Sequence, residues 1–401
     1  MPRRKIWEVP ALHYEEEYGI ERKVTWLELF FDLMFVVMIS QTSAKLTGTI
    51  TIYNLQEFVL IFLPIWWIWI GTTFYNERFE TRGLETRLFY FLILIPFAGM
   101  SVFSSDAITS QGALFALSYV LARGIIVFAW GRAAYHVKEF RPIGIVYMFG
   151  FCTSLLLFLI SIFIPPPERF ILWTIALVLE TITPWFTLKN QDKLPRMSNS
   201  KRPERFGLLV IIALGEMVVN VILGVKKNIL ITSWVAWAAV VAIAICFALW
   251  WVYFDFIARR PPKPGMLAAI TWTNLHLPFI MLLIGAGAAL SNVIALNVTQ
   301  SLNSLEFMTA TLSSALVFLG LIEMTLAHHE LEPTHYRISP YLKIGAGLFG
   351  ICLIPFVWLF QPITLMLILL TLFLVQIIYG VYVWFTQDLD EESESQELES
   401  I

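Results

Sequence analysis

The 401-residue sequence has little charge and little cysteine, and it lacks the short motifs of common soluble enzymes. Charged residues make up 14% and hydrophobic residues 58%, and the mean hydropathy is +0.72. These values exclude an ordinary soluble domain. The cysteines Cys152, Cys246 and Cys352 form no CxxC pair, which argues against a disulfide framework or a thiolate metal site. No phosphate-binding glycine motif, GxSxG or HExxH occurs, so none of these soluble-enzyme chemistries is indicated.

The sequence contains instead a series of apolar runs, each about 18 or more residues long. At about 1.5 Å per residue, such a run crosses a membrane core roughly 30 Å thick as a helix. We therefore expect an all-α integral membrane protein with about twelve transmembrane helices. No cleavable signal peptide is expected, because the first apolar run is too long and too acidic. The predicted helices cover residues 26–47, 55–74, 87–105, 112–130, 142–164, 168–188, 206–224, 230–257, 267–295, 305–327, 341–360 and 362–386.

Basic residues gather in alternate connections between these helices. Of the 27 Lys and Arg residues, 22 lie before the first helix, in alternate loops or beside the eleventh helix. By the positive-inside rule those loops face the cytoplasm, so both termini are expected to be cytoplasmic. The dense negative charge from Asp388 onward indicates a solvated, disordered tail.

The two halves of the chain carry similar patterns. Trp66 follows Asp32 by 34 residues, and Trp250 follows Glu216 by the same interval. Six helices separate the two copies, so the repeats are expected to be parallel, each beginning on the same side of the membrane. We predict a first six-helix repeat with a charged N-terminal segment over residues 1–188, a basic cytoplasmic linker over 189–205, a second six-helix repeat over 206–387 and an acidic disordered tail over 388–401.

Glu28 and Asp32 lie within an apolar segment of membrane-spanning length. Because they are four residues apart, a helix places them on one face, one turn apart. A carboxylate inside a span costs several kcal/mol, so it faces a bundle interior, a partner or a water-filled path. Acids outnumber bases within the predicted spans. An unpaired carboxylate in apolar surroundings favours its protonated form, which is the condition a proton carrier needs.

Four further residues complete a candidate pathway. Glu216 lies near the predicted midplane and matches Asp32 in the repeat, so the two acids are expected at equivalent depths, flanking one cavity. Arg123 is expected to pair with an acid across the bundle, because a guanidinium cannot lose its proton. Asp255 and His276 also lie within predicted spans, although an interfacial acid and a hydrogen-bonded core histidine are the competing interpretations. The candidate solute or ion pathway comprises Glu28, Asp32, Arg123, Glu216, Asp255 and His276.

Several motifs occur in a characteristic order along most of the chain. They are Trp26-Leu-Glu-Leu-Phe-Phe-Asp-Leu-Met-Phe-Val, Trp66-Trp67 with Gly71-Thr-Thr and Arg78-Phe79, Glu204-Arg205-Phe-Gly-Leu-Leu-Val-Ile-Ile-Ala-Leu-Gly-Glu216, Leu249-Trp-Trp-Val-Tyr-Phe-Asp255 and His276-Leu-Pro278. With these motifs the chain resembles the bacterial low temperature requirement A family. Met217 stands where that family commonly has serine, and Arg82 stands at an acidic position. The resemblance implies a multipass membrane protein, named for a cold-growth phenotype, and implies no particular reaction.

Three functions from different classes fit these residues. The first is a secondary transporter of a small solute or ion, proton- or cation-coupled through buried carboxylates. The second is a cation channel lined by acids. The third is an intramembrane enzyme acting on a lipid or lipid-linked carrier, with Asp32 or Glu28 as base and His276 as acid. The internal repeat favours the transporter, because duplication suits alternating access.

The expected setting is the plasma (inner) membrane of a bacterial cell. The expected partners are membrane lipid and an unidentified small solute or ion, with no nucleic acid and no cofactor. His328, His329, Glu330 and His335 could suggest a metal site. Adjacent histidines on a helix point about 100° apart and chelate poorly, so no metal is predicted there.

Overall fold

The computed structural model describes residues 7–13, 24–48, 50–80, 83–195, 201–258, 260–295, 302–327 and 338–399. The chain forms two compact units. The first unit comprises Met1–Leu46, Thr51–Ile212 and Gly265–Leu267, and the second comprises Thr47–Ile50, Ala213–Pro264 and Ala268–Ile401. Helix α8, Lys201–Lys226, contributes residues to both units, with the division after Ile212.

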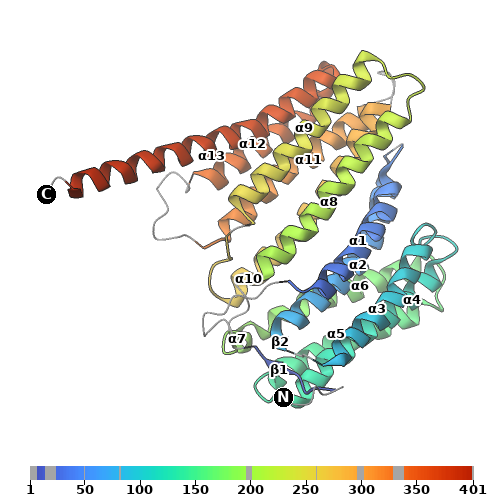
Figure 1. Ribbon diagram of the computed structural model, residues 1–401. Helices are drawn as coiled ribbons and strands as arrows, with labels where there is room; N and C mark the ends of the chain where they lie inside the picture. The colour runs from blue at the N-terminus through green and yellow to red at the C-terminus, as the bar shows by residue number, and fades with distance from the viewer. Residues whose placement is uncertain are drawn as a thin grey trace. The chain divides into compact units, whose positions relative to one another are not determined.

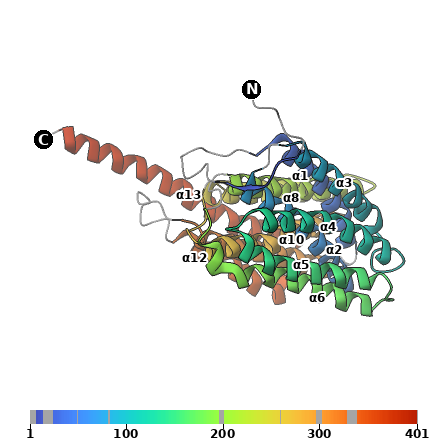
Figure 2. The same ribbon diagram turned by 90° about the horizontal axis from the view of Figure 1, so that it is seen from below.

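Helices that run side by side build the first unit (Figures 1 and 2). Helix α2 is central, because it contacts α1, α4 and α6. In the most apolar 18-residue stretch of α2, 78% of the residues are buried, whereas in the corresponding stretch of the peripheral helix α3 only 22% are buried. In chain order the elements are β1 (Ala11–Leu12), α1 (Trp26–Ser43), η2 (Ala44–Leu46), α2 (Ile52–Arg78), β2 (Phe79–Glu80), α3 (Leu84–Ser104), α4 (Gly112–His136), α5 (Arg141–Ser161), α6 (Glu168–Ile182), η3 (Thr183–Thr187) and α7 (Leu188–Gln191).

Helix α1 begins with a capping box that involves one of the candidate acids. The Thr25 hydroxyl accepts a hydrogen bond from the Glu28 amide at 3.3 Å, and the Glu28 carboxylate accepts one from the Thr25 amide at 2.9 Å. This reciprocal pair satisfies backbone donors that the first helical turn leaves unbonded. It fixes both the start of α1 and the position of the Glu28 side chain.

The N-terminal segment over residues 7–13 packs against the ends of α2, α3 and α4. Strands β1 and β2 pair in antiparallel register, Ala11 with Glu80 and Leu12 with Phe79. The Glu8 amide donates to the Glu85 carboxylate at 3.0 Å, and the Arg132 guanidinium lies 4.5 Å from the Trp7 ring centre. The segment is thereby held by backbone bonds, a charged acceptor and a cation–π contact.

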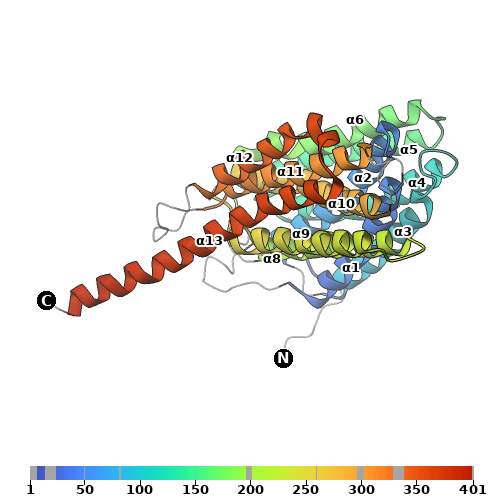
Figure 3. The same ribbon diagram turned by 90° about the horizontal axis from the view of Figure 1, so that it is seen from above.

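In the described residues, the second unit contains the rest of α8, the helices α9 to α13 and the short helix η5 (Figure 3). Glycine permits close packing between α8 and α10: a Cβ on Gly287 would lie 2.8 Å from the Met217 Cα, and one on Gly224 would lie 2.7 Å from the Ser291 carbonyl oxygen. Helix α11 packs along α12, and α13 packs along α9. The elements are α9 (Ser233–Phe256), α10 (Met266–Ala295), α11 (Leu302–Met324), α12 (Ser339–Cys352), η5 (Ile354–Leu359) and α13 (Pro362–Glu399).

The all-α fold of an integral membrane protein is confirmed. In the part of the chain that the structure describes, 11 helices are long and apolar enough to span a membrane, and each coincides with a predicted helix. The helix predicted over residues 341–360 is instead divided into α12 and η5, because Pro355 cannot donate a backbone hydrogen bond to continue the ladder. The repeat and the orientation of the termini remain predictions.

Two of the boundaries that differ from the predicted ones affect the predicted linker and tail. Helix α8 begins at Lys201 rather than at residue 206, so the last five residues assigned to the linker are helical. Helix α13 continues to Glu399, through the tail for which disorder was expected. Glu, Gln and Leu in that tail are good helix formers, and extending an existing helix avoids the cost of nucleation.

Candidate functional site

The two acids of α1 lie against the first turns of α8, within the first unit. Arg205 approaches both acids, with Nη2 at 3.1 Å from Asp32 Oδ1 and Nη1 at 3.4 Å from Glu28 Oε1. Lys201 Nζ lies 2.8 Å from Glu28 Oε1. The exposed fractions of Glu28 and Asp32 are both 2%, and those of Lys201 and Arg205 are 5% and 1%. We call these four residues the tetrad.

Helical spacing explains why the tetrad forms. Glu28 and Asp32 are four residues apart on α1, and Lys201 and Arg205 are four residues apart on α8. Each pair therefore stands on one face of its helix, one turn apart. Two negative and two positive side chains face each other, so the tetrad carries no net formal charge.

Aromatic residues of α2 and α8 surround the Asp32 end of the tetrad. The Trp69 indole donates a hydrogen bond to Asp32 Oδ1 at 2.8 Å, and the Arg205 guanidinium carbon lies 5.6 Å from the Trp69 ring centre. The Phe206 ring packs edge-on to Trp69 at 5.0 Å and to Trp66 at 6.2 Å. These rings exclude water and so strengthen the electrostatic interactions at this end.

Three polar atoms of this region have no hydrogen-bond partner in the part of the chain that the structure describes. They are Asp32 Oδ2, Arg205 Nε and Trp66 Nε1, and all three are buried. Buried polar atoms are nearly always hydrogen-bonded in proteins, so each such exception calls for an explanation. The tetrad is balanced in charge but incomplete in hydrogen bonding.

A separate ion pair lies beside the tetrad on the same turn of α8. Arg202 holds the Glu77 carboxylate of α2 with a two-pronged contact, Nε to Oε1 at 2.9 Å and Nη2 to Oε1 at 2.7 Å, with Nε also 3.2 Å from Oε2. Both side chains are buried. The Arg202–Glu77 pair therefore links α8 to α2, whereas Arg205 pairs with the acids of α1.

The predicted pairing of Arg123 with an acid from another helix is confirmed. Arg123 Nη2 lies 3.0 Å from Glu180 Oε2 of α6, and Arg123 Nη1 donates to the Trp67 carbonyl of α2 at 3.2 Å. Glu180 Oε1 also accepts hydrogen bonds from Tyr119 at 3.0 Å and Ser154 at 2.9 Å. The bonds of Arg123 and Glu180 thus join α2, α4, α5 and α6.

The other candidate residues belong to the second unit. His276 is completely buried; its Nδ1 lies 2.7 Å from the Trp272 carbonyl oxygen and its Nε2 lies 3.1 Å from the Tyr253 hydroxyl. A carbonyl accepts, so Nδ1 carries the proton and Nε2 accepts from tyrosine. Glu216 Oε1 accepts a hydrogen bond from Asn220 one turn later at 2.9 Å. Asp255 is exposed near the end of α9.

Four buried acids face a basic side chain, although acids outnumber bases within the predicted spans. Of the acids considered, Glu28, Asp32 and Glu180 are paired as described, and Glu323 of the second unit pairs with the fully buried Lys343 at 2.8 Å. The bases were missed because Arg205 and Lys343 were assigned to loops or helix ends. The sequence did contain a signal for the two bases of the tetrad. Lys201 and Arg205 are four residues apart, which is a helical spacing, and they continue directly into the apolar pattern of α8. His328, His329, Glu330 and His335 lie outside the described residues, so a metal there stays untested.

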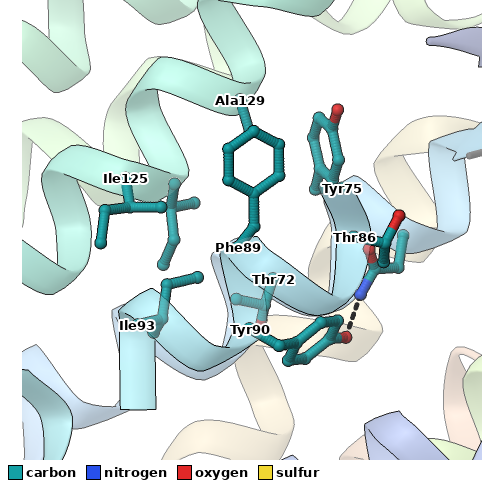
Figure 4. A pocket seen from close by; sticks show the side chains of 10 residues that line it. Thr72, Tyr75, Thr86, Phe89, Tyr90, Ile93, Ile125 and Ala129 are labelled. Carbon is teal, nitrogen blue, oxygen red and sulfur yellow. Dashed lines mark hydrogen bonds between the residues drawn. The ribbon is translucent and has the colours of Figure 1, made fainter. Parts of the chain in front are cut away.

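A small pocket lies between α2, α3 and α4 (Figure 4). Its free volume is about 30 Å³, which suits one or two water molecules and no larger solute. Asn76 donates a short hydrogen bond to the Tyr90 hydroxyl at its edge (Figure 4). The Tyr90 ring lies 5.1 Å from that of Phe31 on α1, one residue before Asp32. The ten lining residues are Thr72, Tyr75, Asn76, Thr86, Phe89, Tyr90, Ile93, Ile125, Ile126 and Ala129.

The chain is 27% identical over 362 residues to "Uncharacterized protein RA0937" of Rhizobium meliloti (strain 1021), with 84% of each chain covered. No solved structure matches the chain. Residues 23–393 match the family described as "Bacterial low temperature requirement A protein (LtrA)". This match includes both acids of α1 and both bases of the tetrad. The chain therefore belongs to the LtrA family of multipass membrane proteins.

Proposed function

We propose that this protein is a secondary transporter of a small solute or ion in the plasma membrane, coupled to protons through Asp32. The observation that carries the proposal is the tetrad. Arg205 lies between two buried carboxylates, and one oxygen of Asp32 has no bonding partner among the described residues. Buried ionisable groups within spans are typical of substrate and proton pathways.

Protonation of Asp32 would change the contact between α1 and α8. Arg205 cannot give up its proton, whereas a carboxylate can accept one. A proton on Asp32 removes the charge that holds Arg205 Nη2 at 3.1 Å, while Glu28 and Lys201 keep theirs. Breaking one partner of a buried ion pair changes the free energy by about 3–5 kcal/mol. A change of that size suffices to shift a population between two helix arrangements.

The same contacts give less support to a channel or an enzyme. A cation-selective pore requires acids whose charge is available to ions, whereas Glu28, Asp32, Glu77 and Glu180 of the first unit all face bases. An enzyme would use His276 as an acid. The bonds of both His276 ring nitrogens are those of a core histidine that packs against Tyr253.

Proton-coupled flux tests the proposal directly. The purified protein is reconstituted into vesicles that hold a trapped pH indicator, and sodium, potassium, chloride, nitrate, phosphate and amino-acid gradients are applied in turn. We expect at least one gradient to move protons in the wild-type protein, and Asp32→Asn to abolish that movement. Asp106→Asn removes an exposed acid from the loop after α3 and should leave it unchanged.

Either of two results would refute the proposal. One is Asp32→Asn protein that folds and retains the wild-type proton movement. The other is wild-type protein that moves no protons under any of the gradients.

A further inference from the structure

We infer that the solute moving with the proton is a small anion, bound at Arg205 and its neighbouring donors after Asp32 is protonated. This inference rests on the proposed function, because it assigns a substrate class to the same site. Two independent features carry it: the charge balance of the tetrad and the kind of atoms left without partners.

The charge balance distinguishes an anion from a cation. With Asp32 ionised, the tetrad holds two negative and two positive groups, so an ion of either sign would leave a net charge in apolar surroundings. Once Asp32 is protonated, Glu28 still faces Lys201 and Arg205 carries an uncompensated positive charge. A monovalent anion then restores neutrality, whereas a cation adds a second uncompensated charge.

The unpartnered atoms favour the same class of ligand. Arg205 Nε and Trp66 Nε1 are buried donors that no described group accepts from. Asp32 Oδ2 is an acceptor while ionised and becomes a donor when it carries the proton. After protonation all three atoms, Arg205 Nε, Trp66 Nε1 and Asp32 Oδ2, are hydrogen-bond donors. An anion accepts hydrogen bonds from donors of all three kinds.

The surroundings of Arg205 are closely packed. The rings of Trp66, Trp69 and Phe206 contact one another at centroid distances of 5.0–6.2 Å, so an anion would enter only as the contact between Asp32 and Arg205 opens, and a small ion is favoured over a larger solute. The titratable and charged groups that face Asp32 or lie beside its partners are Glu28 on α1, Glu77 on α2, Tyr90 on α3, and Lys201, Arg202 and Arg205 on α8.

Equilibrium binding tests this inference without requiring transport. Sodium nitrate and sodium chloride are the probes, and binding to the purified full-length protein in detergent is measured by calorimetry and by the shift in thermal unfolding. Wild-type protein should bind the probes more tightly in acidic than in alkaline buffer. Asp32→Asn has a neutral donor at all pH values, so it should bind about tenfold more tightly than wild type in alkaline buffer and lose the pH dependence.

Two further variants and one control separate binding from folding. Asp32→Asn combined with Arg205→Gln removes both members of one pair and leaves Glu28 with Lys201, so it should fold and yet fail to bind the probes. Trp66→Phe keeps an aromatic ring but removes one donor, and it should weaken binding by about tenfold. Trp185→Phe makes the same change at a half-exposed position of η3 and should have no effect.

The inference is overturned if Asp32→Asn binds the anions no better than wild type, or if the double variant binds them equally well. It is also overturned if sodium, compared with choline, is the ion that stabilises the wild-type protein. These outcomes are distinct from failure of the transport proposal. Loss of proton flux in Asp32→Asn without anion binding refutes only the anion, whereas wild-type proton flux in that variant refutes the proposed coupling through Asp32.

Discussion

The first unit contains two buried arginine–carboxylate clusters whose hydrogen bonding differs. In the Arg123 cluster, Glu180 Oε1 accepts from Tyr119, Ser154 and Arg123 Nε at 2.9–3.2 Å. Each cluster leaves one carboxylate oxygen without a hydrogen bond in the described ranges, Glu180 Oε2 and Asp32 Oδ2. The arginines differ: every Arg123 nitrogen contacts Glu180 or the Trp67 carbonyl, whereas Arg205 Nε has no acceptor among the described residues. A densely bonded ion pair is costly to disturb and favours a single arrangement. We therefore interpret the Arg123 cluster as structural and the tetrad as the site of change.

The glycine next to Arg123 gives a prediction at the scale of one residue. A Cβ on Gly71 would lie 2.1 Å from Arg123 Nη1 and 3.1 Å from Ile126 Cγ2. Gly71→Ala should therefore displace the guanidinium from the Trp67 carbonyl and leave a buried donor unpaired. The expected loss is about 1–3 kcal/mol of unfolding free energy, measured as a lower thermal or denaturant midpoint in detergent.

Gly124, one residue after Arg123 on α4, provides the control. Nothing lies within 4 Å of a Cβ built at this position, so Gly124→Ala should be neutral or stabilise the helix by up to about 1 kcal/mol. Equal stability changes in the two variants would contradict the assigned role of Gly71.

At the scale of elements, α11 and α12 approach closely enough for backbone to meet backbone. A Cβ on Gly347 would lie 2.6 Å from the Ser313 carbonyl oxygen and 2.9 Å from the Val317 nitrogen, and one on Gly320 would lie 2.6 Å from the Pro340 carbonyl oxygen. Small residues permit this kind of packing between membrane helices, where lipid offers apolar contacts as good as those of another helix. The Glu323–Lys343 ion pair adds a polar contact between the same two helices.

We predict that Gly347→Ala weakens the pairing of α11 with α12. Since the atoms that meet the new methyl group belong to backbone, they cannot move aside as a flexible side chain would, and the helices must separate. The expected cost is about 1–3 kcal/mol of unfolding free energy, measured as a lower thermal or denaturant midpoint in detergent. Gly345, two residues away, is the control, because nothing lies within 4 Å of a Cβ built there. A loss of unfolding free energy in Gly345→Ala comparable to that in Gly347→Ala would contradict this interpretation.

At the scale of the whole molecule, orientation in the membrane is the main prediction from charge. The 22 basic residues gathered in alternate connections should place both termini in the cytoplasm. A reporter fused after Lys138 should then be cytoplasmic, and one fused after Lys227 should be outside. A C-terminal reporter found outside the cell would contradict both the orientation and the even number of spans.

The sequence alone determined the fold class and most helix positions. Apolar runs long enough to span a membrane can satisfy their backbone hydrogen bonds there only as helices or closed barrels, and their lengths match helices. Each of the 11 candidate spans accordingly lies where a predicted helix lies. The four-residue spacing of Glu28 and Asp32 also indicated correctly that they share a face, because that spacing is a local property of a helix.

Only the tertiary structure showed what those acids face. Arg205 is 173 residues from Asp32 in the sequence, and Glu180 is 57 residues from Arg123. Local periodicity carries no information about which helices become neighbours. The basic residues before the seventh predicted helix were therefore assigned to a linker, whereas packing placed two of them against α1. Charge compensation inside a membrane depends on the whole bundle, so the partner of a buried acid is decided by the fold.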